Sequence, residues 1–120
     1  MKQALAEYVI DHSERKDSMQ IKVKQQDNVI TALLCGELDH HSAQETREYL
    51  DKLIAKFRNS DLVLDLKNLS FMDSSGIGVI IGRYKKLKSD GRRMYVANPN
   101  RQIDKVMSLS GLYSIIKKLS

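Results

Sequence analysis

Two loops hold most of the residues whose types and spacing could carry chemistry. Asp73-Ser74-Ser75-Gly76 follows an apolar run and precedes a helical pattern, and Gly36 to His41 (GELDHH) has the same setting earlier in the chain. A serine hydroxyl at the start of a helix is a good place to attach phosphate, because the free N–H groups and the helix dipole favour an anion there. The competing interpretation is simple helix capping, for which Asp and Ser are preferred. The sequence therefore predicts either a modification or docking site or a cap.

Two glycines and a histidine pair extend these loops. Gly76 and Gly78 leave the backbone uncovered, so we expect another molecule to approach closely there. His40 and His41 beside Asp39 suggest a metal site or a general base. Adjacent side chains are expected to diverge, however, and no third ligand follows at suitable spacing. We therefore expect no metal, and we expect Asp39 to accept hydrogen bonds within its loop or from a partner.

The catalytic and nucleotide-binding motifs closest to these loops are incomplete. The segment around Ser74 lacks the first glycine of the nucleophile elbow G-x-S-x-G. Gly76, Gly78 and Gly82 have the wrong spacing for the dinucleotide fingerprint, and no Walker A sequence occurs. We therefore expect neither an enzyme nor a cofactor, and a small nucleotide-binding protein is the weaker alternative.

Composition narrows the remaining classes. The 120 residues suit one domain, with 42% hydrophobic and 29% charged residues. Cys35 is the single cysteine and is expected to be a small buried side chain, so no internal disulfide can form. No signal peptide or membrane span is evident, which predicts a cytoplasmic protein that does not enter a membrane. The net charge of +5 includes a basic strip from Arg83 to Arg93, interpreted as a solvated helix face because no nucleic-acid motif accompanies it.

The elements that must position the two loops alternate between strand and helix. Period-two and apolar patterns predict strands over residues 20–24, 29–35, 62–66, 94–97 and 113–116. Apolar spacing of 3.6 residues predicts helices after a capping box at 42–45, from the serine loop to a stop at Gly91, and around 103–107, with 67–73 left as a loop. This order predicts an α/β fold with a mostly parallel mixed β-sheet, an antiparallel edge hairpin and helices packed against it. Both loops then leave carboxyl ends of strands, so we expect them to meet.

The first 18 residues differ from the rest in charge. They sum to −1, whereas residues 19–120 sum to +6. Apolar residues at helical spacing predict a helix over 2–10, followed by a polar linker. We therefore expect an N-terminal extension over 1–18 and a domain over 19–120.

Three segments carry a resemblance to a known family: GELDHH, LSFMDSSGIGVIIGRYKKLK and MSLSGLYSIIKKL. They resemble the anti-sigma factor antagonists of spore-forming bacteria, which consist of a STAS domain. The likeness spans residues 19–118; DSSGIG marks the wider family, whereas ELDHH and GRYK point to the sporulation sigma-F branch. The resemblance implies the STAS fold and a protein that, when unphosphorylated, binds an anti-sigma factor serine kinase and frees a sporulation sigma factor. It further implies that the kinase phosphorylates Ser74 and that a PP2C-type serine phosphatase reverses the modification.

The same resemblance gives expectations for the interface and the chain ends. Members usually continue past the last strand into a C-terminal helix, which residues 19–120 lack, and we expect the N-terminal helix to take its place, an added leader being the alternative. A STAS scaffold or stress-signalling component is the alternative function. The residues expected to contact the partner are Asp39, His40, Asp73, Ser75, Gly76 and Gly78.

Overall fold

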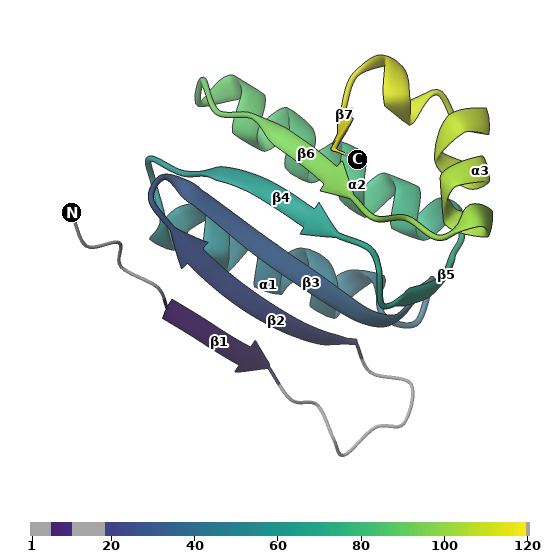
Figure 1. Cartoon of the computed structure of the whole chain (residues 1–120), viewed down its shortest axis with the longest axis horizontal. Coiled ribbons are helices and arrows are strands. Elements are labelled where there is room, and N and C mark those ends of the chain that lie inside the picture. Colours follow the sequence, from purple (N-terminus) through teal and green to yellow (C-terminus); the bar gives the residue numbers. More distant parts are fainter. Residues whose placement is uncertain (1–5, 11–18, 120) are drawn as a thin grey trace.

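The computed structural model describes residues 6–10 and 19–119, which form one mixed β-sheet with helices packed on it (Figure 1). The strands run in the order β1-β2-β3-β4-β6-β7, and β5 pairs with β3 away from this path. β1 with β2 and β2 with β3 are antiparallel; the other pairs are parallel. The predicted fold class is confirmed. The elements are β1 (Ala6–Ile10), β2 (Gln20–Gln26), β3 (Val29–Leu38), α1 (Ala43–Lys56), β4 (Asp61–Asp65), β5 (Leu69–Met72), α2 (Ser74–Ser89), β6 (Met94–Ala97), α3 (Arg101–Leu109), a 3₁₀ turn (Leu112–Ser114) and β7 (Lys117–Leu119).

The core lies between the sheet and the pair α1 and α2, which Figure 1 shows behind the strands. Alternate residues of β2 and β3 are buried, as a strand with one covered face requires. The stripes predicted for the two long helices are buried as well, including Leu50 and Leu53 in α1 and Ile80 and Leu87 in α2.

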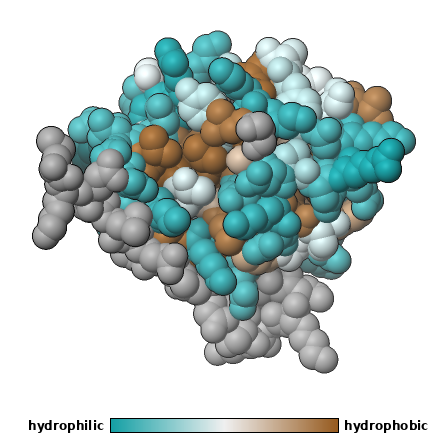
Figure 2. All heavy atoms as spheres, viewed as in Figure 1, coloured by the Kyte–Doolittle hydropathy of each residue, from teal (hydrophilic) through white to brown (hydrophobic). Residues whose placement is uncertain are grey.

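The opposite face of the sheet carries no helix in the same view. Half-buried Leu33 and Val63 lie at alternate positions of β3 and β4, out of phase with the fully buried Leu34 and Leu64. Figure 2 shows this face as an apolar centre surrounded by hydrophilic side chains. The molecule is therefore a two-layer α/β structure over its described residues.

The prediction of a helix over residues 2–10 is wrong for residues 6–10, the part that the structure describes. Residues 6–10 form strand β1, which pairs with β2 from Ala6 opposite Gln25 to Ile10 opposite Ile21. The run Tyr8-Val9-Ile10 contains an aromatic and two β-branched residues, which favour strands, and β2 offers a free edge to pair with. The strand extends the sheet sideways, so it does not take the place of a helix. The predicted linker over 11–18 lies outside the described residues.

Two further segments differ from their predictions. Residues 69–72, expected within a loop, form β5 beside the end of β3. The last strand was expected over 113–116, but residues 112–114 make a 3₁₀ turn and β7 begins at Lys117. Gly111, with φ of +82°, turns the chain into that 3₁₀ segment in a conformation that glycine adopts without strain.

The basic strip from Arg83 to Arg93 is only partly a solvated face. Arg83 is buried and its Nε lies 2.9 Å from Asp51 Oδ1 on α1. Burial lowers the pKa of Arg83, while the neighbouring Asp51 acts to raise it. This pair ties α2 to α1, so Arg83 contributes to packing.

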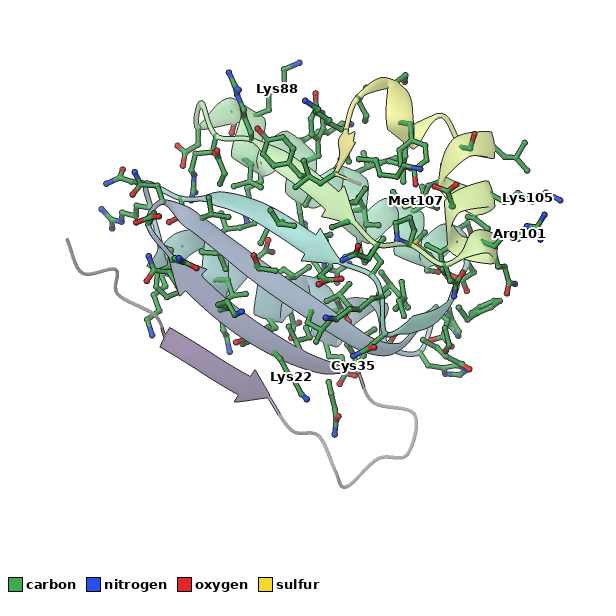
Figure 3. All side chains as sticks on the ribbon, in the orientation of Figure 1. Lys22, Cys35, Lys88, Arg101, Lys105 and Met107 are labelled. Carbon is green, nitrogen blue, oxygen red and sulfur yellow. The ribbon has the colours of Figure 1, made fainter. Side chains whose placement is uncertain are left out.

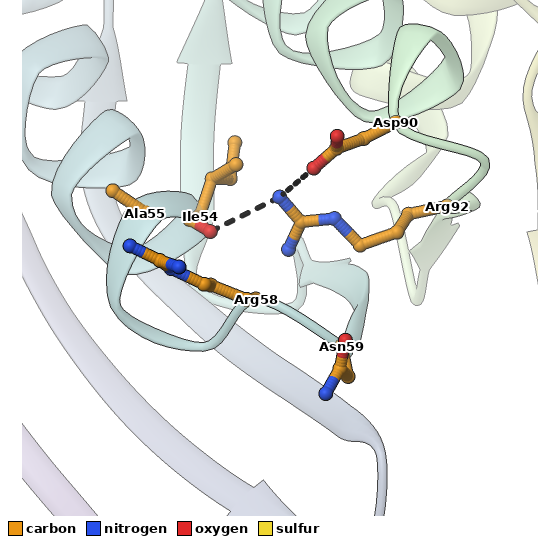
Figure 4. Close-up of a pocket in the computed structure, with 6 residues that line it drawn as sticks. All are labelled: Ile54, Ala55, Arg58, Asn59, Asp90 and Arg92. Carbon is orange, nitrogen blue, oxygen red and sulfur yellow. Dashed lines mark hydrogen bonds and ion pairs between the residues drawn. The ribbon is translucent and has the colours of Figure 1, made fainter.

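Arg92 is the second structural arginine of the strip. Its side chain, 9% exposed, reaches the end of α1, where Nη2 donates to Ile54 O at 3.1 Å (Figure 4). Nη1 donates to Phe57 O at 2.9 Å. Asp90 Oδ2 pairs with the same guanidinium at 2.9 Å. Carbonyls in the last turn of a helix lack intrahelical donors, and a cation there is favoured by the helix dipole. Arg92, which lies between α2 and β6, therefore caps the C-terminal end of α1.

Candidate functional site

The two loops singled out in the sequence meet at one end of the sheet. β5 runs parallel to β3 with Leu38 opposite Met72, so both loops leave adjacent carboxyl ends of strands. Asp73 N donates to Leu38 O at 3.3 Å, and His40 N donates to Asp73 Oδ2 at 3.3 Å. The predicted meeting of the loops is confirmed, and Asp73 is the residue that joins them.

Asp73 also caps helix α2. Its backbone is extended, and Oδ1 accepts hydrogen bonds from Ser75 N at 2.8 Å and Gly76 N at 3.2 Å. The capping interpretation of this motif is therefore correct for Asp73. Ser74 is the first helical residue and is exposed, whereas Ser75 is half-buried. Since the carboxylate already satisfies two N–H groups of the first turn, the Ser74 hydroxyl is left at the surface beside a helix N-terminus.

Gly76 and Gly78 have different roles. A Cβ on Gly76 would lie 2.6 Å from Leu38 O and 2.6 Å from Met72 Cγ, distances that real side chains do not adopt. Gly76 is buried, and its lack of a side chain lets α2 start directly against β3. A Cβ on Gly78 would meet nothing within 4 Å, and Gly78 is exposed. The expectation of an uncovered backbone therefore fits Gly78 and is wrong for Gly76.

The GELDHH loop is held by its own side chains. Asp39 Oδ1 accepts from His41 N at 2.9 Å and from Ser42 N at 3.1 Å. Its carboxylate therefore stabilises its own loop, which was one of the two roles expected for it. The capping box predicted at 42–45 does not form. Ser42 Oγ instead donates to Glu37 O at 2.6 Å, and Glu45 Oε1 accepts from Met19 N at 2.9 Å. Asp39 supplies the acceptor for Ser42 N that Glu45 was expected to provide.

The histidine rings do not diverge as expected. The centroids of His40 and His41 lie 4.6 Å apart with the rings tilted by 59°, and both side chains are exposed. Within residues 6–10 and 19–119, no group of three His, Cys, Asp or Glu is placed to hold a metal ion. Cys35 is half-buried, with Sγ 3.7 Å from Asn68 Nδ2. His40 therefore contributes an exposed ring beside the serine loop.

Phe71 is a surface residue of the site that the sequence pattern did not indicate. Phe71 on β5 is 37% exposed and lies two residues before Asp73. Aromatic side chains are enriched in protein–protein interfaces, so Phe71 is a candidate contact residue beside the serine loop. Alternation does not predict this exposure, because it would place Phe71 on the same face as the buried Leu69, and four residues are too few to separate a strand from a loop.

Similarity to known proteins identifies the family. The STAS domain family matches residues 20–120, and the chain belongs to it. The chain is 40% identical over 99 residues to the anti-sigma F factor antagonist of Paenibacillus polymyxa, covering 82% of this chain and 85% of that protein. It is 34% identical over 99 residues to the anti-sigma-B factor antagonist of Bacillus subtilis, with coverages of 82% and 89%.

Solved structures agree with this assignment. The unphosphorylated form of the anti-sigma factor antagonist SpoIIAA superposes with a TM-score of 0.71 at 29% identity, covering 83% of this chain and 88% of that one. The phosphorylated form of the Bacillus cell fate determinant SpoIIAA matches with a TM-score of 0.61 at 26% identity, covering 96% and 92%. The resemblance to STAS-domain antagonists is confirmed. In the described part of the chain, no helix is long and apolar enough to span a bilayer.

Proposed function

We propose that this protein is an anti-sigma factor antagonist of the sporulation sigma-F branch. Its unphosphorylated form binds an anti-sigma factor serine kinase in the cytoplasm and frees the sigma factor, and phosphorylation of Ser74 inactivates it. The antagonists named for sigma F in Paenibacillus polymyxa and Lysinibacillus sphaericus, 40% and 34% identical, support this function. The observation that carries this proposal is the exposed Ser74 at the first turn of α2, next to the Asp73 carboxylate that joins the two loops.

The chemistry of the loop suits a switch that acts without refolding. A phosphate on Ser74 adds a charge of about −1.5 to −2 at neutral pH. It would stand next to the Asp73 carboxylate, so a partner packed on this loop meets both bulk and a concentrated negative charge. The N-terminus of α2 favours an anion by roughly 0.3–1 kcal/mol at an exposed site, which opposes any loss of the helix. Phosphorylation should therefore block the surface and leave the fold intact.

The docking surface combines exposed groups with groups that hold them in place. His40, Ser74, Gly78 and the exposed ring of Phe71 are the parts that a partner can reach. Asp39, Asp73 and Gly76 act from beneath, because their polar groups or close packing fix the two loops. Ser75 donates its N–H to Asp73 and is half-buried, which favours Ser74 as the phosphate acceptor.

In this proposal the protein is the substrate and ligand of enzymes rather than an enzyme itself. The anti-sigma factor serine kinase adds the phosphate, and a PP2C-type serine phosphatase removes it. No cofactor or nucleic acid takes part in the contact.

Phosphate mapping tests the site directly. The protein is incubated with the anti-sigma F kinase and ATP, and the modified peptide is sequenced by mass spectrometry. We expect one phosphate on Ser74, no modification of Ser74→Ala, and normal modification of Ser75→Ala. Phosphate on Ser75 with Ser74 bare would refute the assignment.

A second candidate is supported by the names of other relatives. The anti-sigma-B factor antagonist of Bacillus subtilis is 34% identical, and that of Staphylococcus aureus is 26% identical. The chain would then serve another signalling branch with the same loop, as a stress-signalling component. Parallel binding measurements with anti-sigma F and anti-sigma B kinases separate the two, because the cognate kinase should bind at least about tenfold more tightly.

A further inference from the structure

The end of the molecule remote from Ser74 contains a pocket that the proposed switch does not use. It has a volume of about 350 Å³ and lies between the last turns of α2, the start of β6 and the segment before β7. Ser74 and Lys88 are 14 positions apart in α2, which corresponds to about 21 Å along the helix axis. The lining residues are Tyr84, Lys88, Arg92, Arg93, Met94, Tyr95, Ile115 and Lys117.

Cations and aromatic rings are paired in this pocket. Lys88 Nζ lies 5.8 Å from the centroid of the Tyr84 ring, and interaction with the Tyr95 side chain raises the pKa of Arg93. Lys117 of β7 is exposed and pairs in register with Tyr95. Lys88, Arg93 and Lys117 are all exposed and line one pocket with two tyrosine rings, and the Tyr84 ring lies within cation–π distance of Lys88.

The charge of the pocket is not cancelled by its own lining. None of the eight lining residues is acidic. Two carboxylates lie beside the pocket without lining it. Asp61 Oδ1 accepts from Arg93 N at 2.9 Å and acts to raise the pKa of Arg93, and Asp90 pairs with the Arg92 guanidinium. Arg92 directs its guanidinium to the end of α1, so Lys88, Arg93 and Lys117 remain to meet a ligand.

An apolar wall completes the site. Met94 is buried, and Ile115 is 44% exposed although it is a large apolar residue. Together with the two tyrosine rings they form a surface that an apolar group can cover. Pockets of this volume with a few convergent polar groups are typical of small-ligand sites.

We propose that this pocket binds an organic phosphate, with the phosphate held by Lys88, Arg93 and Lys117 and an apolar body packed on the tyrosines and Ile115. A dianionic phosphate matches three cations better than a single carboxylate does, and charge-assisted hydrogen bonds are the stronger kind. The apolar wall adds affinity that inorganic phosphate cannot gain. The site is independent of the Ser74 loop, so its ligand need not compete with the partner of the switch.

The test uses 1-naphthyl phosphate as the probe. The chain has no tryptophan, so naphthyl fluorescence can be followed without that background. We expect 1-naphthyl phosphate to bind at least tenfold more tightly than 1-naphthol or inorganic phosphate, and to shift the amide signals of Tyr95 and Ile115 in NMR spectra. Equal binding of 1-naphthol, or shifts confined to other regions, would overturn the proposal.

Charge reversal identifies the cations. Lys117→Glu and Lys88→Glu should each weaken probe binding about tenfold. Lys105→Glu is the matched control, because Lys105 lies on α3 and projects from another side of the molecule than Lys88 (Figure 3). Equal weakening by the control would show that only the overall charge attracts the probe and would refute the site. Two variants on different elements guard against a folding defect in one of them. Ser74→Ala should leave probe binding unchanged, so failure here is distinguishable from failure of the proposed switch.

Discussion

The two ends of helix α2 solve different problems with different chemistry. At its N-terminus, the Asp73 carboxylate caps the helix and joins two loops, while Ser74 stays exposed. Beyond its C-terminus, the Arg92 guanidinium is buried against the carbonyls that end α1 and pairs with Asp90. In the proposed function the first end accepts an added negative charge, whereas a buried positive charge is already part of the fold at the second end. We propose that the first end serves as the switch because the groups that fix it lie beneath Ser74.

The largest expected effect breaks the packing under the switch loop. Gly76→Ala places a methyl group 2.6 Å from Leu38 O, so α2 must move away from β3. We expect a loss of about 3 kcal/mol in the free energy of unfolding, as for overpacked cores. Urea denaturation measures it. Gly78→Ala is the control, since its methyl group meets nothing within 4 Å, and it should be neutral or stabilising by about 0.5–1 kcal/mol. Equal stability of the two variants would contradict the different roles of the glycines.

The next effect removes the fixing group at the other end. Arg92→Met keeps a long side chain but leaves the carbonyls of Ile54 and Phe57 without their donor. We expect destabilisation by about 2 kcal/mol, the cost of unsatisfied buried polar groups. Arg93→Met, which alters an exposed side chain of the same strip, should change stability by no more than about 0.5 kcal/mol. Similar losses from both variants would mean that the strip acts only through its total charge.

A smaller effect is expected from the cap itself. Asp73→Ala removes the acceptor of Ser75 N and Gly76 N as well as the contact with His40 N. We expect a loss of about 1 kcal/mol, typical of N-cap removal, together with faster amide hydrogen exchange at His40. Glu37→Ala, a change at an exposed carboxylate in the adjacent loop, serves as the control. Unchanged hydrogen exchange at His40 in Asp73→Ala would show that the bond from His40 N to the Asp73 carboxylate does not stabilise the contact between the loops.

The smallest effect on stability is expected from charge at Ser74. Ser74→Glu adds one negative charge that the helix N-terminus favours and Asp73 opposes. The free energy of unfolding should therefore change by less than about 1 kcal/mol. Thermal melting checks this. A large loss would mean that modification acts by unfolding the loop rather than by covering a docking surface.

The sequence predicts the elements that have a long, single pattern. Alternation over 20–24 and a nearly continuous apolar run over 29–35 predict the hairpin of β2 and β3, and apolar spacing with a glycine stop predicts α2 up to Gly91. Short elements were harder. The five residues of β1 fit a helical or an extended pattern equally, and pairing with the free edge of β2 decides between them. β5 has only four residues and is defined by its contact with β3, which lies 31 or more positions away in the chain.

Within the candidate site, residue types were predictable and partners were not. Asp73 and Ser74 were found from a helix start, and the joining of the loops followed from the parallel sheet. The capping box at 42–45 does not form because Asp39, three residues before Ser42, accepts from Ser42 N, the group that Glu45 was expected to satisfy. Arg83 and Arg92 could not be told from exposed neighbours, because burial of an arginine depends on carbonyls and carboxylates distant in sequence.

Binding to the anti-sigma factor kinase tests the central claim most directly. Unphosphorylated wild-type protein, Ser74→Ala and Ser74→Glu are each titrated with the kinase in the presence of ADP and of ATP. With ADP, wild-type protein and Ser74→Ala should bind equally, and Ser74→Glu should bind at least about tenfold more weakly because its charge lies at the docking surface. With ATP, wild-type protein should be released while Ser74→Ala stays bound. Equal binding of Ser74→Glu and Ser74→Ala under both conditions would contradict the proposal that charge at Ser74 controls the interaction.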